Sequence, residues 1–191
     1  DLPGGVPDAD DTAGALLALR ALAPAGPRVR RSAAEGVRWL LGIQNRDGGV
    51  PTFCRGWGRL PFDRSAADLT AHALQAFACW MDALPRGLAD RARRAGRRAL
   101  AYLRRQQRPE GSWVPLWFGC ESAAGQANPT FGTARVVSAL AALRRSRWPV
   151  DGEMLARGLE WLLSAQGPAG GWGGAPGMDP SIEETALATD A

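Results

Sequence analysis

Apolar residues along this chain recur at the three- and four-residue spacing of helices, in runs separated by turns that contain glycine and proline. Two kinds of run alternate. Runs such as 13–22 and 133–143 are rich in small residues and carry few charges, so they can be buried on all sides. Runs such as 155–165 carry Arg or Glu on one face and Leu or Trp on the other. Because strand signals are scarce, the pattern predicts an all-α protein.

The runs form a repeat of two helices closed by a glycine turn. A Thr-Ala pair opens each small-residue run, at residues 12, 70, 133 and 185. In between, an aromatic-Leu pair at Trp39, Tyr102 and Trp161 is followed five residues later by Gln, and the third residue of the turn comes six after Gln. Helix pairs with a period near 60 residues are typical of an array or a closed α/α toroid. We expect residues 1–191 to form a single α/α barrel domain that is incomplete at both ends, with inner helices starting near 12, 70, 133 and 185.

Three carboxylates, Asp8, Asp10 and Asp11, lie within four residues where the run 13–22 is about to begin. If they face a cavity, repulsion and desolvation raise at least one pKa, and that group could serve as an acid. The alternative is a solvated turn, since Asp is also an ordinary residue at a helix start and suits the helix dipole there.

The repeat brings a second set of polar residues toward the same rim. In a closed toroid the parallel inner helices direct their N-terminal ends to one mouth, so residues two before and two after each repeat Thr converge. Asp10 and Asp68 occupy the first of these positions, and His72, the only histidine, occupies the second. A lone histidine is also common as a satisfied core residue.

Composition narrows the class of protein. All 23 basic residues are Arg and the net charge is +4; they cluster in 91–108 and 144–147 at the spacing of outer helix faces, which indicates a solvated surface. An acidic membrane surface is the alternative, and no nucleic-acid-binding motif accompanies the charge. The three cysteines show no CxxC spacing, so neither disulfides nor a metal site is expected. No signal peptide or transmembrane run is visible.

The motifs now resemble a known family. The stretch from Asp8 to Ala13, DADDTA, resembles the DxDDTA motif of bacterial squalene-hopene cyclases, which class II diterpene cyclases share in part. Residues 157–172 and 102–113 resemble that family's QW repeat. Residues 68–72, DLTAH, resemble its segment that supplies the histidine partner of the catalytic acid.

The resemblance implies the C-terminal catalytic barrel half of a two-barrel class II triterpene cyclase. It makes Asp10 the general acid that protonates a terminal alkene, with His72 hydrogen-bonded to it. Asp8, Asp11 and Asp68 become acidic neighbours. Trp117 matches an aromatic residue that lines the start of the cation's path, and Phe118 and Phe131 are further candidates for the lining.

Three departures from the family pattern stand out. Residues 120–127 are extra, Pro129 replaces a tyrosine that helps to position active-site water, and Glu183 and Glu184 introduce two carboxylates at the last inner helix. These changes put reprotonation of the acid and squalene itself as substrate in doubt.

We therefore expect a squalene-hopene cyclase-like isomerase of hopanoid biosynthesis that needs no cofactor or metal and is inactive as this isolated fragment. The alternatives are a class II diterpene cyclase acting on a prenyl diphosphate, with Arg135 near the mouth holding the anion, and a non-catalytic helical-repeat module that binds a lipid or protein. The expected partners are a squalene-like isoprenoid, the missing second barrel, the cytoplasmic side of a bacterial membrane and, as an open option, a second copy. The membrane-contacting surface is expected to lie outside this chain, and no nucleic acid is expected.

Overall fold

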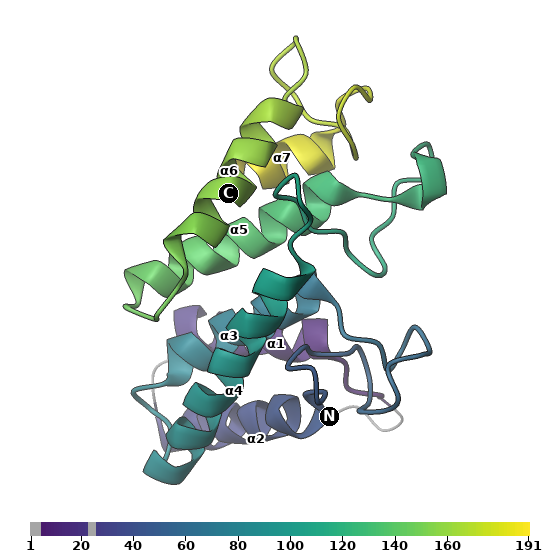
Figure 1. Ribbon diagram of the computed structural model, residues 1–191. Coiled ribbons are helices and arrows are strands. Elements are labelled where there is room, and N and C mark those ends of the chain that lie inside the picture. Colours follow the sequence, from purple (N-terminus) through teal and green to yellow (C-terminus); the bar gives the residue numbers. More distant parts are fainter. Residues whose placement is uncertain (1–4, 23–25) are drawn as a thin grey trace. The chain divides into compact units, whose positions relative to one another are not determined.

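The computed structural model describes residues 5–22 and 26–191, and in this part of the chain the regular elements are helices joined by irregular loops (Figure 1). Within that part of the chain, the one β-type pairing is an isolated bridge between Val50 and Ala66. The all-α prediction is confirmed. The elements are α1 (Ala9–Leu22), α2 (Pro27–Ile43), α3 (Ala67–Trp80), α4 (Arg86–Gln106), the 3-10 turn η1 (Ala124–Gln126), α5 (Pro129–Arg145), α6 (Gly152–Ala165) and α7 (Ile182–Asp190).

The chain divides into two compact units, Asp1–Tyr102 and Leu103–Ala191. In the first unit α1 packs against α2 and α3, and in the second α5 packs against α6 and α7. Each unit therefore contains the expected pairing of small-residue and amphipathic helices. The prediction that residues 1–191 form a single, incomplete α/α barrel domain stays a prediction.

The small-residue helices begin three or four residues before each repeat Thr, earlier than the expected starts. Three of the four starts have a side-chain cap. Asp8, Asn128 and Ser181 each accept a hydrogen bond from the backbone N–H of the third helical residue. Such caps satisfy an N–H group that has no partner inside the helix. Asp10 and Asp11 consequently lie in the first turn of α1 and not ahead of it.

The repeat Thr joins each of α3, α5 and α7 to the glycine turn before it. Thr70 Oγ1 accepts a hydrogen bond from the Val50 N–H at 2.8 Å and donates to the Ala66 carbonyl at 2.6 Å. The same contact joins Thr133 to the Trp113 N–H and Thr185 to the Trp172 N–H, both at 3.0 Å. The glycine turn thus fixes where the next inner helix starts.

The repeat Gln joins the same turns to the amphipathic helices. Gln44 Nε2 donates to the Gly48 carbonyl at 2.8 Å and to the Ala95 carbonyl of α4 at 3.0 Å. Gln107 makes the equivalent pair of bonds to Gly111 and Met154, both at 2.9 Å, and Gln166 bonds Gly170 at 2.7 Å. Each repeat Gln thus bonds a carbonyl of its own glycine turn, and Gln44 and Gln107 also bond a carbonyl of the next amphipathic helix.

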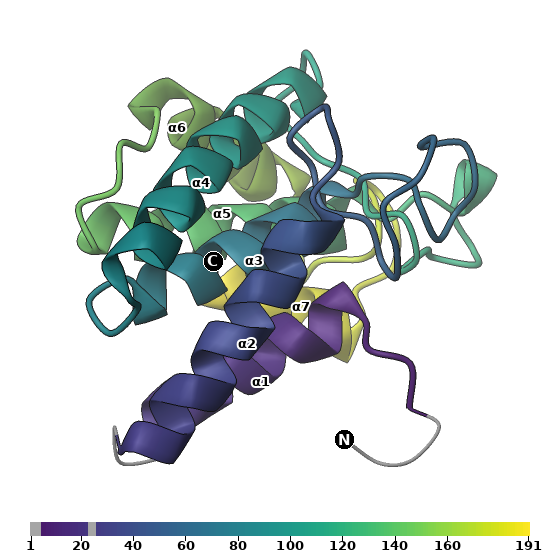
Figure 2. The same cartoon turned by 90° about the horizontal axis from the view of Figure 1, so that it is seen from below.

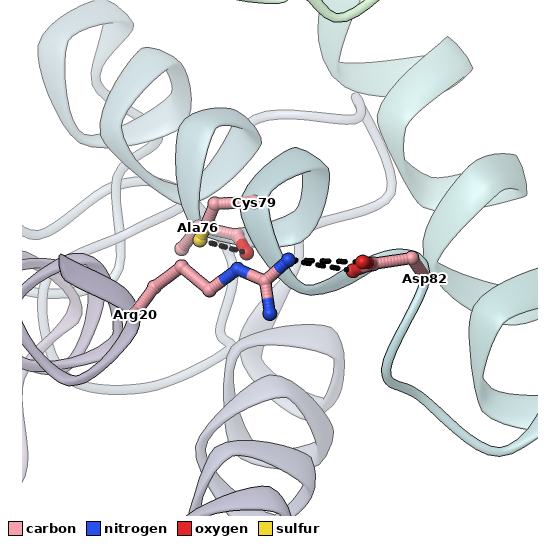
Figure 3. Close-up of polar contacts among 4 residues, drawn as sticks. All are labelled: Arg20, Ala76, Cys79 and Asp82. Carbon is pink, nitrogen blue, oxygen red and sulfur yellow. Dashed lines mark hydrogen bonds and ion pairs between the residues drawn. The ribbon is translucent and has the colours of Figure 1, made fainter. Parts of the chain in front are cut away.

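Helices α1 and α3 run in the same direction, because residues further along α1 contact residues further along α3 and the turn after it. The Trp80 indole donates to the Leu16 carbonyl at 2.8 Å, and Arg20 lies over the Trp80 ring. Arg20 also pairs with Asp82 at 2.9 Å, beside the Cys79 thiol (Figure 3). These contacts hold the two C-terminal ends together, which places both N-terminal turns at the opposite end of the pair.

The arginines of α4 lie on its solvent-facing side, so a solvated surface accounts for that charge cluster. Apolar residues of the same helix, such as Leu100 and Leu103, are buried. No helix in residues 5–22 and 26–191 is both long and apolar enough to cross a membrane. The exposed arginines of α4 are Arg86, Arg91, Arg93, Arg94, Arg97, Arg98, Arg104 and Arg105.

Candidate active site

Asp10 and His72 meet at the N-terminal turns of α1 and α3. His72 Nδ1 and Asp10 Oδ1 share a hydrogen bond of 2.6 Å, although the residues are 62 positions apart. The imidazole is nearly enclosed, with 11% of its side chain exposed, whereas 39% of the Asp10 side chain is exposed. A carboxyl group held by a buried imidazole and still open to its surroundings is suited to exchanging a proton with a bound molecule.

Asp8 and Asp11 are positioned by the start of α1 and not by the imidazole. Asp8 Oδ1 accepts the Asp11 N–H at 2.7 Å, so Asp8 caps the helix. Asp11 is fully exposed, and its pKa lies above its usual value mainly because of the negative charge of Asp8. The raised pKa that the acidic cluster shows is therefore that of Asp11, an exposed residue.

Asp68 and Gly14 complete the surroundings of His72. Asp68 is buried and precedes His72 by four residues, so both lie on the same side of α3. Gly14 follows Asp10 by one turn of α1, and a Cβ atom at Gly14 would lie 3.6 Å from His72 Cε1. The ring thus packs against α1 where a side chain is lacking. Gly14 lies two residues after the repeat Thr12, the same position that His72 occupies after Thr70, so the repeat spacing identifies it.

The three candidate lining aromatics belong to the second unit. Phe131 is buried in the first turn of α5, and its ring stacks on Phe118 with 4.5 Å between centroids and 19° between planes. Trp117 and Phe118 lie in the loop before α5 and are partly exposed. The structure thus brings Phe118 and Phe131 together as one aromatic face.

Two of the departures from the expected family pattern, Pro129 and Glu184, lie at or next to the start of α5. Pro129 is the first residue of α5. Proline suits this position because the N–H group that it lacks would have no hydrogen-bond partner inside the helix. Asn128 caps the helix and donates to Glu184 Oε1 of α7 at 2.8 Å. Glu184 is buried and also accepts from the Ser181 hydroxyl, whereas Glu183 is exposed. The two added carboxylates therefore differ: Glu184 joins α7 to α5, and Glu183 faces solvent.

Residues 120–127, which the sequence analysis interprets as extra, form a short closed loop. The Cys120 N–H donates to the Gln126 carbonyl at 3.1 Å, and η1 fills the end of the loop. In the part of the chain that the structure describes, no group of three or more His, Cys, Asp or Glu side chains is arranged to hold a metal ion.

Helix pairs joined by glycine turns, with an acid and an imidazole brought together at one end, define a helical-repeat protein with a candidate proton-transfer site. The particular family follows from comparison with known proteins. Residues 5–190 match the family described as the squalene-hopene cyclase C-terminal domain, and the chain belongs to this family.

Individual relatives agree. The chain is 35% identical over 157 residues to squalene–hopene cyclase of Alicyclobacillus acidocaldarius, covering 72% of this chain and 21% of that protein. It is 33% identical over 181 residues to the probable squalene–hopene cyclase of Sinorhizobium fredii, covering 87% and 25%. It is 33% identical over 187 residues to drimenyl diphosphate synthase of Streptomyces showdoensis, covering 96% and 31%. The chain thus spans about a fifth to a third of the length of these relatives.

Proposed function

We propose that this chain supplies the acid of a class II terpene cyclase, in which Asp10 protonates an alkene of a linear isoprenoid. The observation that carries the proposal is the 2.6 Å contact between Asp10 and His72. It is supported by membership of the cyclase family and by the names of the relatives, which are terpene-cyclising or prenyl diphosphate enzymes. A non-catalytic module would have no need for this contact.

The proposed step moves one proton. With His72 protonated, its Nδ1–H donates to Asp10 Oδ1 and leaves the acidic proton on the other carboxyl oxygen. The π electrons of the alkene take that proton, and the more substituted carbon becomes cationic. The carboxylate that remains is stabilised by the imidazolium, so the pair shares the charge that develops. Attack by successive alkenes closes the rings, and loss of a proton or addition of water ends the sequence.

An alkene is a very weak base, so this chemistry requires an enclosed site without bulk water. The 39% exposure of Asp10 within this chain means that further protein must cover it during turnover. We propose that the second barrel expected for the full-length enzyme provides this cover, and that the 191 residues alone are inactive. Asp68 adds a buried acid four residues before His72, on the same side of α3.

The aromatic residues are proposed to stabilise the cation after ring closure begins. A carbocation makes no hydrogen bonds, and an aromatic face contributes on the order of 0.5 to 2 kcal/mol. The stacked rings of Phe118 and Phe131 present such a face, and Trp117 lies in the same loop.

For the substrate, our first proposal is a squalene-like triterpene precursor, which makes the enzyme an isomerase of hopanoid biosynthesis at the cytoplasmic side of a bacterial membrane. The second is a prenyl diphosphate, with Arg135 binding the anion. This second candidate is favoured by the drimenyl diphosphate synthase and by a copalyl diphosphate synthase of Streptomyces cyslabdanicus, which is 31% identical over 190 residues and matches 98% of this chain.

The test is conversion of squalene and of geranylgeranyl diphosphate by the full-length enzyme, with products identified by mass spectrometry. Asp10→Asn removes the acidic proton but keeps the shape of the side chain, and we expect turnover to fall at least ~10³-fold. The matched control is Asp82→Asn, because Asp82 is an exposed acid of the same unit at the far end of α3. Normal turnover by the Asp10 variant would refute the assignment, and the preferred substrate decides between the two candidates.

A further inference from the structure

One pair of buried polar side chains joins the start of α5 to the start of α7. Helix α7 lies beside α5 in both views (Figure 1, Figure 2). Asn128 is 3% exposed and Glu184 is 7% exposed, and Asn128 Nδ2 donates to Glu184 Oε1 at 2.8 Å. A buried contact of this kind is costly to break, because no water replaces the lost partner. The pair is therefore suited to fixing the geometry of these two helix starts.

Glu184 determines the orientation of the Asn128 amide. The two ends of an asparagine amide have nearly the same shape, but the oxygen accepts hydrogen bonds and the nitrogen donates them. Glu184 is itself held in place, because its N–H donates to the Ser181 hydroxyl at 3.0 Å and that hydroxyl donates to its second carboxylate oxygen. An ionised carboxylate only accepts, so it selects the orientation in which the amide nitrogen faces α7 and the amide oxygen faces α5.

The amide oxygen of Asn128 in turn fixes the position of the aromatic face. Asn128 Oδ1 accepts the backbone N–H of Phe131 at 3.0 Å, in the first turn of α5. The Phe131 ring is buried and stacks on Phe118. If the amide were turned round, its NH₂ group would face the Phe131 N–H, and two donors cannot bond each other. The cap would then be lost, and the first turn of α5 would no longer be held where it is.

The surroundings of Asn128 are tightly packed. A Cβ at Gly174 would lie 2.6 Å from Cys120 Cβ and 3.6 Å from Asn128 Oδ1. The Thr130 N–H donates to the Gly174 carbonyl at 3.2 Å. The segment before α7 thus contacts both the start of α5 and the loop that carries Phe118. Within this unit, the contact between Asn128 and Glu184 belongs to one packed cluster that includes the aromatic face.

We propose that Glu184 is a positioning residue for the cyclisation, because it acts through Asn128 to hold the rings of Phe131 and Phe118 where they stabilise the carbocation. This inference rests on the proposed function, which gives those rings their role. Stabilisation by an aromatic face requires the cation to lie over the ring at short distance. Rings that are held less firmly leave the cation more time to lose a proton before all rings have closed. Loss of the Glu184 contact therefore raises the share of partly cyclised products as well as slowing the reaction.

The experiment measures turnover and product composition in variants of the full-length enzyme, with squalene and with geranylgeranyl diphosphate. Glu184→Leu removes the acceptor and keeps a side chain of similar size. We expect turnover to fall at least ~10-fold and partly cyclised products to predominate, since two aromatic faces are affected. Glu184→Gln keeps an acceptor for the Asn128 amide, and we expect turnover within ~3-fold of the parent and the same products.

A second change, at Asn128, tests whether Glu184 acts through that residue. Serine is as good a helix cap as asparagine, and its hydroxyl accepts a hydrogen bond without needing a partner to orient it. The double variant Asn128→Ser/Glu184→Leu should therefore regain the parent's products and most of its turnover. The control is Asp151→Ala, which removes the side-chain cap of α6 in the same unit, where Asp151 accepts the Glu153 N–H at 3.0 Å. This control should lower Tm and leave the products unchanged.

Three outcomes would overturn the inference: unchanged products in Glu184→Leu, a double variant no better than Glu184→Leu, or the same change of products in the Asp151 control. If Glu184→Leu does not fold, Asn128→Ala takes its place, because it removes the cap itself, and unchanged products in that variant would also overturn the inference.

Binding of protonated N,N-dimethyldodecylamine, a long-chain amine that mimics the cation, is measured by calorimetry in parallel. A parent enzyme that cyclises neither substrate would refute the proposed function. Weaker amine binding by Glu184→Leu that the double variant restores would still support the positioning of the rings, whereas equal affinities would refute it. The two proposals can therefore fail separately.

Discussion

Replacing Gly111 with alanine isolates how the glycine turns dock on the amphipathic helices. Gly111 has a φ of +108°, and a Cβ there would lie 2.4 Å from the Arg157 carbonyl oxygen of α6. Gly170 occupies the equivalent turn of the next repeat with a φ of +87°, and a Cβ there meets nothing within 4 Å. The two positions thus share the left-handed conformation and differ in the contact.

The expected loss of unfolding free energy has two sources, the strain of the left-handed backbone and the overpacking against the next helix. Left-handed strain at a non-glycine residue costs ~1–2 kcal/mol, and alanine recovers ~0.4–1 kcal/mol by restricting the unfolded chain. We therefore expect Gly170→Ala to lower the free energy of unfolding by about 1 kcal/mol or less. In Gly111→Ala the backbone of α6 must also move away, which adds ~1–3 kcal/mol of overpacking, for a total of ~1–4 kcal/mol.

The assay is urea-induced unfolding followed by circular dichroism and tryptophan fluorescence. Gly48→Ala provides a replicate in the first unit, because a Cβ at Gly48 would lie 2.4 Å from the Arg98 carbonyl oxygen and its φ is +92°. Equal losses for Gly111→Ala and Gly170→Ala would show that backbone strain alone sets the effect, and the argument from helix docking would be wrong.

Three further outcomes are expected. At pH 8 iodoacetamide should modify exposed Cys54 much faster than Cys79, because burial raises the pKa of the Cys79 thiol to about 11 and leaves roughly one part in a thousand as thiolate; equal rates by mass spectrometry would contradict this. Because the pKa of Asp11 is raised, its favourable contribution to stability is full below about pH 3.8 and is lost as the pH rises through the raised value, so Asp11→Asn should increase Tm at pH 7 and not at pH 3. Glu184→Ala leaves the buried Asn128 amide without an acceptor and should lower the free energy of unfolding by ~1–3 kcal/mol, and an unchanged urea midpoint would refute this.

Much of the fold could be predicted because the repeat shows itself as fixed spacings between residues that are close in the sequence. The Thr-Ala pairs, the Gln and the glycine turns recur at fixed offsets, and each marks a real backbone contact, as Thr70 with Val50 and Gln44 with Gly48 show. The sequence analysis placed the helix starts too late. The residues that cap the helices are of three different types, Asp8, Asn128 and Ser181, so no capping residue recurs with the repeat.

The candidate site could be predicted in part. The positions of Asp10 and His72 within the repeat predicted that they lie close together, and the structure brings them into contact. Pairings between side chains far apart in the sequence left no such signal. Asn128 and Glu184 are 56 residues apart, and nothing periodic connects them. The hydrogen bonds that arrange the loop between α2 and α3 around Asp63 were not predicted either, because an irregular loop has no characteristic spacing.

The helices that carry Asp10 and His72 are both hydrogen-bonded to one short stretch of backbone, residues 50–52. The Thr52 carbonyl holds the first residue of α1, and the Val50 N–H holds Thr70 near the start of α3. We expect a displacement of this stretch to move both helix ends in the same direction, so that the distance between the Asp10 carboxyl group and the His72 imidazole stays the same. A movement of the neighbouring loop would therefore shift Asp10 and His72 together and leave the distance between their side chains unchanged.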